Sequence, residues 1–270
     1  MNFDMRIDPE EMIKYAKKNA LKYQNNLPYP HIVIDDFFDE SDLTGILDEF
    51  PDKNDIDWMK FSEKNSIKLA SKDENQLGLK TFHLVNVLNS GSFLKFLENL
   101  TGIKGLISDP YLFGGGLHSI HNGGYLRVHA DYNKHNTLPL ERRVNVLLYL
   151  NKNWKDSFNG NLELWNEGMT HCVKEIQPLF NRIVVFNTDS TSYHGHPKKV
   201  SCPSNRSRKS LALYFFTVQN AAEPRLEHST LYMDRPSDRV WTVIENIVKS
   251  FIPPIVVSIL KKFRKVMKKS

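Results

Sequence analysis

The second half of the chain is a succession of short segments with strand character, separated by turn signals and with no helical pattern between them. They follow the run Gly114-Gly115-Gly116, and Asn159-Gly160 between two of them is a typical hairpin turn. Many short strands at such spacing predict an antiparallel barrel or a double-sheet jelly roll. The segments expected as strands are 125–131, 144–150, 162–165, 172–176, 183–186, 193–196 and 210–218.

The first half of the chain predicts helices that cover this β-core. Residues 9–23 have the apolar spacing of an amphipathic helix, and Asp8 before Pro9 is a suitable N-cap. Further elements are expected as a strand at 31–35, a helix from Asp39 to the stop at Pro51, and a helix at 93–100, with a polar surface excursion at 52–80. We therefore expect a mainly β, α+β protein: a helical and strand cover over 1–111, a β-core over 112–219 and an appendage over 220–270.

The formal net charge of +5 is a property of the C-terminal end, because the last ten residues hold six Lys and Arg residues. Residues 255–270 predict an amphipathic helix with one apolar and one basic face, and peripheral contact with an anionic membrane is one interpretation of it. The alternatives are a contact of this basic face with nucleic acid or with an acidic protein, and a helix packed on its own domain or on a partner subunit. The rest of the chain is close to neutral, so no nucleic-acid partner is expected.

The two cysteines, Cys172 and Cys202, are too few and too isolated for a disulfide framework or a zinc site. The N-terminus lacks the apolar run of a signal peptide, and no stretch is apolar over the length that spans a bilayer. We expect a cytoplasmic protein, with the inner face of the membrane as the place of any peripheral attachment.

The tripeptide His129-Ala130-Asp131 carries the strongest chemical signal. In an extended strand residues i and i+2 point to the same side, so both side chains can hold one ion. Two imidazoles and one carboxylate form the ligand set of non-haem Fe(II) and leave open positions for oxygen chemistry. Tyr125 and Arg127 continue the same alternation with apolar neighbours between them, which predicts a polar strand face directed into a cavity.

A third ligand is expected from the segment that follows the apolar run at 183–186. Both His194 and His196 would face the same way in an extended segment. We favour His194, because Gly195 allows the backbone to approach the ion closely and Pro197 is expected to begin a loop that directs His196 away.

An iron site of this kind leaves three coordination positions free, two for a 2-oxo acid and one for O2. If the 2-oxo acid is 2-oxoglutarate, its remote carboxylate needs a fixed cation. Arg208 is the candidate, with Ser210 on the same strand face, since a guanidinium fork and a hydroxyl suit a carboxylate. Arg206 is the rival, but its neighbours are typical of a loop.

Taken in order, five segments resemble the prolyl 4-hydroxylase-like branch of the Fe(II)/2-oxoglutarate-dependent dioxygenases. They are 124–131, 142–151, 160–165, 193–197 and 208–211. The resemblance implies a cupin-like double-stranded β-helix, with Fe(II) on His129, Asp131 and His194 and with 2-oxoglutarate on Arg208. It further implies that Tyr125 and Tyr149 line the 2-oxoglutarate pocket, that O2 is consumed and that ascorbate serves as reductant. One departure is Asn159-Gly160, where the family often has two glycines; Asn tolerates the left-handed conformation, so the turn should form.

The implied reaction is hydroxylation of a substrate carbon, coupled to conversion of 2-oxoglutarate into succinate and CO2. The substrate stays open: a prolyl or other protein side chain, a free amino acid, or a glycan or lipid intermediate. Two alternatives remain, a catalytically silent β-barrel that binds a glycan or a scaffold partner, and an iron enzyme that uses another 2-oxo acid or none. Other histidines, among them His118, are interpreted as structural or exposed. Lys134, Arg142 and Arg143 are interpreted as a solvated rim of the site, with selection of an anionic substrate as the alternative.

Overall fold

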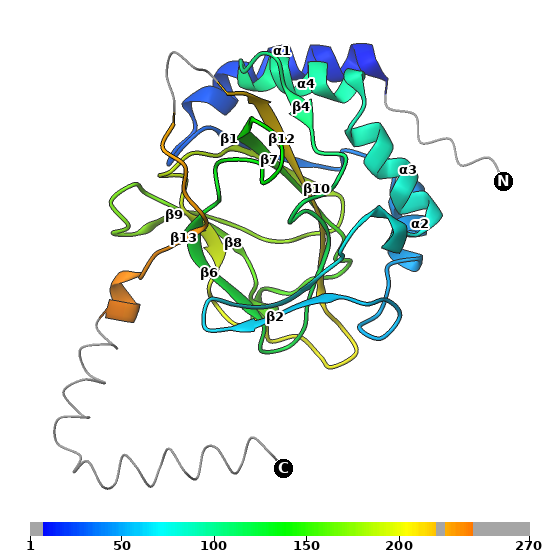
Figure 1. Cartoon of the computed structure of the whole chain (residues 1–270). Coiled ribbons are helices and arrows are strands. Elements are labelled where there is room, and N and C mark those ends of the chain that lie inside the picture. Colours follow the sequence, from blue (N-terminus) through cyan, green and yellow to red (C-terminus); the bar gives the residue numbers. More distant parts are fainter. Residues whose placement is uncertain (1–7, 220–224, 240–270) are drawn as a thin grey trace, which may run out of the picture.

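The computed structural model describes residues 8–219 and 225–239, and its main feature is one antiparallel sheet that curls on itself (Figure 1). The strand order is β1-β10-β7-β12-β5-β3-β6-β11-β8-β9, and β2, β4 and β13 pair with strands of this path. The strands are β1 (His31–Asp35), β2 (Met59–Glu63), β3 (Ser66–Ala70), β4 (Ile107–Ser108), β5 (Gly116–Ile120), β6 (Tyr125–Ala130), β7 (Leu140–Tyr149), β8 (Leu162–Trp165), β9 (Cys172–Ile176), β10 (Arg182–Asn187), β11 (His194–His196), β12 (Arg208–Val218) and β13 (Leu231–Tyr232). The mainly β, jelly-roll fold expected from the strand spacing is confirmed.

Four helices cover one side of the sheet: α1 (Pro9–Asn25), α2 (Glu40–Asp48), α3 (Leu79–Leu88) and α4 (Gly91–Thr101) (Figure 1). The side chain of Asp8 accepts hydrogen bonds from two backbone N–H groups of the first turn of α1, as its N-cap position predicts. Phe93 and Phe96 of α4 are fully buried in the largest hydrophobic cluster, together with apolar side chains of β7, β10 and β12. Within the described residues, no helix is both long and apolar enough to cross a membrane.

The interpretation of 52–80 as a surface excursion is wrong. This segment forms the β2–β3 hairpin, and β3 pairs with both β5 and β6 inside the main sheet. Its side chains are mostly polar, so the hydrophobic pattern gives little sign of a strand whose pairing rests on backbone hydrogen bonds. Helix α3 and strand β5 were also not expected from the sequence.

Strands β1 and β3, both before residue 112, complete the sheet formed by later strands. The division of the chain at residues 111 and 219 therefore stays a prediction about sequence organisation. The amphipathic helix expected at 255–270 lies outside the described residues.

Candidate active site

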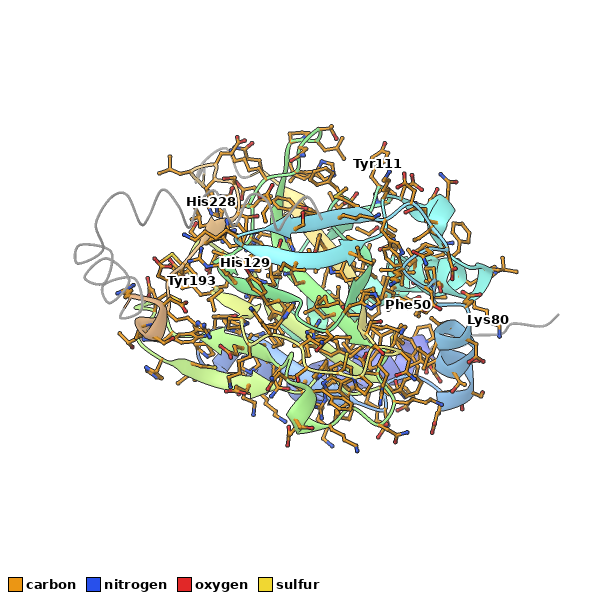
Figure 2. The ribbon with its side chains drawn as sticks, turned by 90° about the horizontal axis from the view of Figure 1, so that it is seen from below. Phe50, Lys80, Tyr111, His129, Tyr193 and His228 are labelled. Atoms are coloured by element: carbon orange, nitrogen blue, oxygen red, sulfur yellow. The ribbon has the colours of Figure 1, made fainter. Side chains whose placement is uncertain are left out.

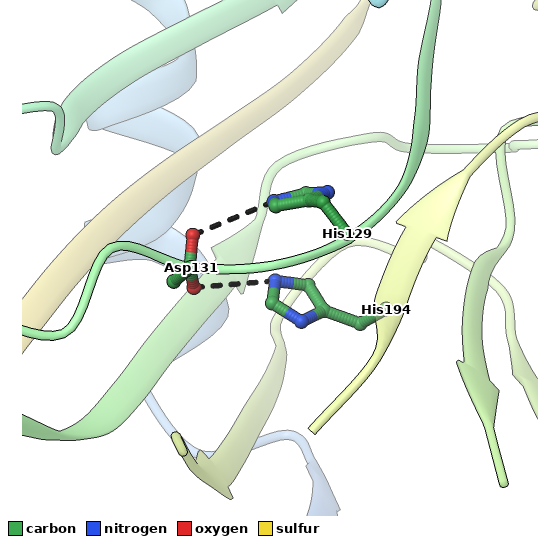
Figure 3. A group of neighbouring side chains, drawn as sticks. All are labelled: His129, Asp131 and His194. Carbon is green, nitrogen blue, oxygen red and sulfur yellow. Dashed lines mark ion pairs between the residues drawn. The ribbon is translucent and has the colours of Figure 1, made fainter. Parts of the chain in front are cut away.

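His129, Asp131 and His194 meet at one point of the curled sheet (Figure 3). His129 lies near the end of β6, Asp131 follows this strand directly, and His194 opens β11 opposite His129 in the strand register. The Nε2 atom of His129 is 3.4 Å from Oδ1 of Asp131, and Nε2 of His194 is 3.4 Å from Oδ2. One donor atom from each residue lies within 4.8 Å of the other two, which is the convergence that a bound metal ion requires.

Backbone carbonyls fix which nitrogen of each imidazole faces the centre. Nδ1 of His129 is 2.9 Å from the carbonyl oxygen of Arg127, and Nδ1 of His194 is 2.9 Å from that of Ser192. A carbonyl oxygen only accepts, so Nδ1 carries a hydrogen and Nε2 is the nitrogen that faces the centre of the site, where it can bind a metal ion. Burial and the neighbouring charge of His194 lower the pKa of His129, which favours the neutral form that binds a metal.

The carboxylate of Asp131 is held by a buried polar network. Nη2 of Arg142 lies 3.0 Å from Oδ2, and Nδ2 of Asn145 donates to the same oxygen at 2.8 Å. Nε of Arg142 in turn donates to Oδ1 of Asn145, and the guanidinium lies over the rings of Tyr214 and Tyr132. Burial alone would raise the pKa of Asp131, but the charges of Arg142 and His194 and the imidazole hydrogen bonds hold it well below its usual range.

Arg142 was interpreted from the sequence as part of a solvated rim, and that interpretation is wrong. Its side chain is 1% exposed and forms the ion pair with Asp131. Alternation along β7 places Arg142 and Arg143 on opposite faces of the strand. The local sequence does not tell which of these two faces is buried.

A cavity of about 460 Å³ extends from His129, Asp131 and His194 into the sheet. This volume lies in the range of small-molecule sites, roughly 300–1,000 Å³. Arg208 and Ser210 line it on β12, and they share its wall with His118 and His196. The other walls include the apolar side chains Ile120, Leu126, Leu147 and Leu162.

Arg208 is buried and preoriented toward this cavity. Its Nε donates to the carbonyl oxygen of Gly160 at 2.7 Å, and its Nη2 donates to the hydroxyl of Tyr149 at 3.3 Å. Gly160 has a φ of +80°, and a Cβ there would lie 2.9 Å from Cδ of Arg208. The hairpin expected at Asn159-Gly160 is not formed, because β7 and β8 pair with other strands and not with each other; Asn159 instead follows a short 3-10 turn with a φ of 55° and a ψ of −157°, and Gly160 leaves room for the guanidinium.

Tyr149 is fully buried and contacts Arg208 from behind rather than forming part of the cavity wall. Tyr125 does not line the cavity either, and its hydroxyl donates to the carbonyl oxygen of Lys64 in the turn between β2 and β3. A register shift between His194 and His196 pairs the latter with Leu126, so Leu126 instead faces the cavity. The predicted contact between Tyr125 and the cosubstrate has no support in this geometry.

Two expectations about histidines are also wrong. His196 is 3% exposed and lines the cavity, on the same face of β11 as His194, although Pro197 was expected to direct it away. His118, interpreted from the sequence as structural or exposed, is buried and lines the cavity from β5. Both ring nitrogens of His196 and the Nε2 atom of His118 are buried and lack a hydrogen-bond partner within the described residues. Buried polar atoms of this kind point to a ligand. Arg206 lies outside the cavity, hydrogen-bonded to the carbonyls of Lys152 and Asn153.

The donor set and the cavity fit a metal and a dicarboxylate. Two neutral imidazole nitrogens and one carboxylate suit a divalent ion such as Fe(II). Arg208, Ser210 and the unpartnered imidazoles supply donors for a carboxylate at the inner wall, with an apolar space between.

Comparison with protein families gives a match to the 2OG-Fe(II) oxygenase superfamily over residues 115–216. No curated protein matches the chain. Among solved structures, a prolyl 4-hydroxylase from Phytophthora capsici is similar over 84% of this chain and 72% of its own, with a TM-score of 0.53 and 21% identity.

Two further solved structures are similar at 16% identity. One is a Trichoplax adhaerens prolyl hydroxylase in complex with a hypoxia inducible factor peptide fragment, with a TM-score of 0.53 over 77% of this chain and 91% of its own. The other is a Pseudomonas putida prolyl-4-hydroxylase, with a TM-score of 0.52 over 76% and 98%. At these identities the structural likeness shows the fold.

Proposed function

We propose that this chain, whose residues 115–216 match the 2OG-Fe(II) oxygenase superfamily, hydroxylates an unactivated carbon and converts 2-oxoglutarate into succinate and CO2. The enzyme class is a 2-oxoglutarate-dependent dioxygenase, for which Fe(II), 2-oxoglutarate and O2 are implied. The observation that carries the proposal is the arrangement of a two-histidine, one-carboxylate cluster and a buried arginine along one cavity.

In this proposal His129, Asp131 and His194 hold Fe(II), which together with O2 supplies the oxidising power for a C–H bond. The chain itself presents the Nε2 atoms of two imidazoles and keeps the carboxylate of Asp131 ionised through Arg142. Arg208 fixes the remote carboxylate of 2-oxoglutarate, assisted by the hydroxyl of Ser210 and backed by Tyr149. These contacts orient the reactants, while the cavity wall limits access of water.

The substrate is proposed as a protein side chain, a free amino acid, or a glycan or lipid intermediate, and ascorbate as the reductant. The peptide bound to the Trichoplax neighbour makes a peptide one candidate. For location we propose the cytoplasm, with residues 255–270 as a contact to anionic lipid.

Succinate formation by the full chain with Fe(II), 2-oxoglutarate and O2 tests the reaction class. Asp131→Asn should abolish this turnover, because the amide is neutral and offers a poorer ligand. Asp48→Asn is the matched control, since Asp48 is exposed at the end of α2 and is not part of the cavity wall. Turnover by Asp131→Asn at the wild-type rate would refute the metal assignment, and its absence in the wild type would favour the silent barrel.

A further inference from the structure

The β2–β3 hairpin forms one wall of the cavity. Figure 2 shows its two cyan strands running across the molecule beside the labelled His129. Strand alternation directs every second side chain inward, and the residues of the hairpin that line the cavity are Met59, Phe61, Ser66, Lys68 and Ala70. Ile67, between two of them, is 43% exposed on the outer side. Lys68 is thus the one charged group that these two strands direct into the cavity.

Lys68 has no counter-ion among the described residues. No carboxylate oxygen there lies within 4.0 Å of its Nζ, which lies over the ring of Phe61 at 5.0 Å from the centroid. The other cations on the cavity wall are accounted for, because Arg142 is paired with Asp131 and Lys72 with Asp57. Arg208 is assigned to the remote carboxylate of 2-oxoglutarate.

The ammonium of Lys68 interacts electrostatically with Asp131 and Arg142 at the ligand cluster and with Arg208 on β12. Burial lowers its pKa to about 8, the negative charge of Asp131 opposes this shift, and Arg142 and Arg208 add to it. Burial is the largest cause of the lowered pKa of His118, and the charge of Lys68 is the second largest. A partly buried ammonium without a partner is unfavourable, so a ligand anion at this position would relieve the cost.

We propose that Lys68 binds an oxyanion, a carboxylate or a phosphate, that belongs to the primary substrate, and that the enzyme therefore acts on an anionic molecule. The inference rests on the proposed function, since 2-oxoglutarate has two carboxylates and these are taken by the metal and by Arg208. Lys68 is then a surplus cation facing the space in which the substrate must lie. An ammonium with three donors suits either oxyanion as a point charge.

Calorimetric titration tests this proposal on the full chain. The anaerobic protein is first loaded with Fe(II) and saturating 2-oxoglutarate, and then inorganic phosphate and acetate are titrated in separate experiments. We expect at least one of these anions to bind to the wild type and Lys68→Met to weaken that binding by at least about tenfold. Lys68→Arg, which keeps the charge, should retain most of the affinity.

Lys60→Met is the matched control, because Lys60 is an exposed lysine of the same hairpin between two inward-facing residues. It should bind the anion as the wild type does. The inference is overturned if neither anion binds to the wild type, if Lys68→Met binds it equally well, or if the anion only displaces 2-oxoglutarate. Failure of the first step, the binding of 2-oxoglutarate to the Fe(II)-loaded wild type, would instead refute the proposed function.

Discussion

Replacing Arg208 by methionine is expected to weaken 2-oxoglutarate binding strongly while leaving the fold in place. The guanidinium is 4% exposed, and its Nε and one Nη2 hydrogen are used by Gly160 and Tyr149. The remaining N–H groups stay available for a carboxylate in the cavity. Methionine fills much of the same volume, and an uncompensated buried cation is itself unfavourable, so the variant should fold.

The magnitude follows from the burial of this charge. Truncating one partner of a buried, hydrogen-bonded charge pair costs about 2–5 kcal/mol, which corresponds to a rise in Kd of roughly 30-fold to several thousand-fold. Tyr149→Phe removes only the 3.3 Å hydrogen bond behind Arg208. That loss is worth about 0.5–1.5 kcal/mol, so the Kd for 2-oxoglutarate should rise by about 2- to 12-fold.

The assay is calorimetric titration of 2-oxoglutarate into the anaerobic Fe(II)-loaded protein, with succinate formation as a second readout. Pyruvate lacks the remote carboxylate, so Arg208→Met should lose its preference for 2-oxoglutarate over pyruvate. Thermal unfolding of each variant checks that the fold is intact. A Kd for 2-oxoglutarate within twofold of the wild type would refute the assignment of Arg208 to the cosubstrate.

Three further predictions concern the network, the strand pairing and the tail. Arg142→Met should destabilise the metal-free protein by about 3 kcal/mol at pH 7. Folding lowers the pKa of Asp131 from 3.8, so the stabilisation by the Arg142–Asp131 ion pair is fully present above that pH and is lost as the pH falls through the lower folded pKa. The measurement is urea unfolding of both proteins as a function of pH. A difference in the free energy of unfolding that does not change with pH would contradict the prediction. Gly195→Ala should weaken Mn(II) binding by about tenfold or more, because a Cβ there would come within 2.9 Å of two backbone carbonyl oxygens of β6. Gly91→Ala, with nothing within 4 Å of the added Cβ, is the control, and equal affinities would count against this reasoning. Truncation to residues 1–240 should reduce co-sedimentation with anionic vesicles, and equal pelleting would end the membrane proposal.

Helix α1 and the strands around the site could be predicted because each depends on local rules. Asp8 and Pro9 mark a helix start in the sequence, and the structure has the cap at that residue. His129 and Asp131 are two residues apart on an extended segment, so the strand period places them together before any tertiary contact is known. The choice of Arg208 over Arg206 also followed from local pattern, and the structure places only Arg208 at the cavity.

The errors share one cause, which is pairing between distant strands. Tyr125 faces away from the cavity because a register shift between β6 and β11 changes which residues of β6 turn inward. His196 stays on the face of His194, because Pro197 lies beyond the last residue of β11 and does not turn His196 away. Lys68 belongs to a strand whose place between β5 and β6 is set by backbone hydrogen bonds with segments far along the chain. No local pattern around these residues carries that information.

The sequence by itself indicated the strand-rich core and the candidate residues of the site: two histidines and a carboxylate with the spacing of metal ligands, and an arginine suited to a carboxylate. These follow from side-chain types and from periods of two or 3.6 residues, which act over a few positions. Only the tertiary structure decided the burial of Arg142 against Asp131 and the inward direction of Lys68. Burial and facing depend on which strands pair and in which register, and both are properties of the whole sheet.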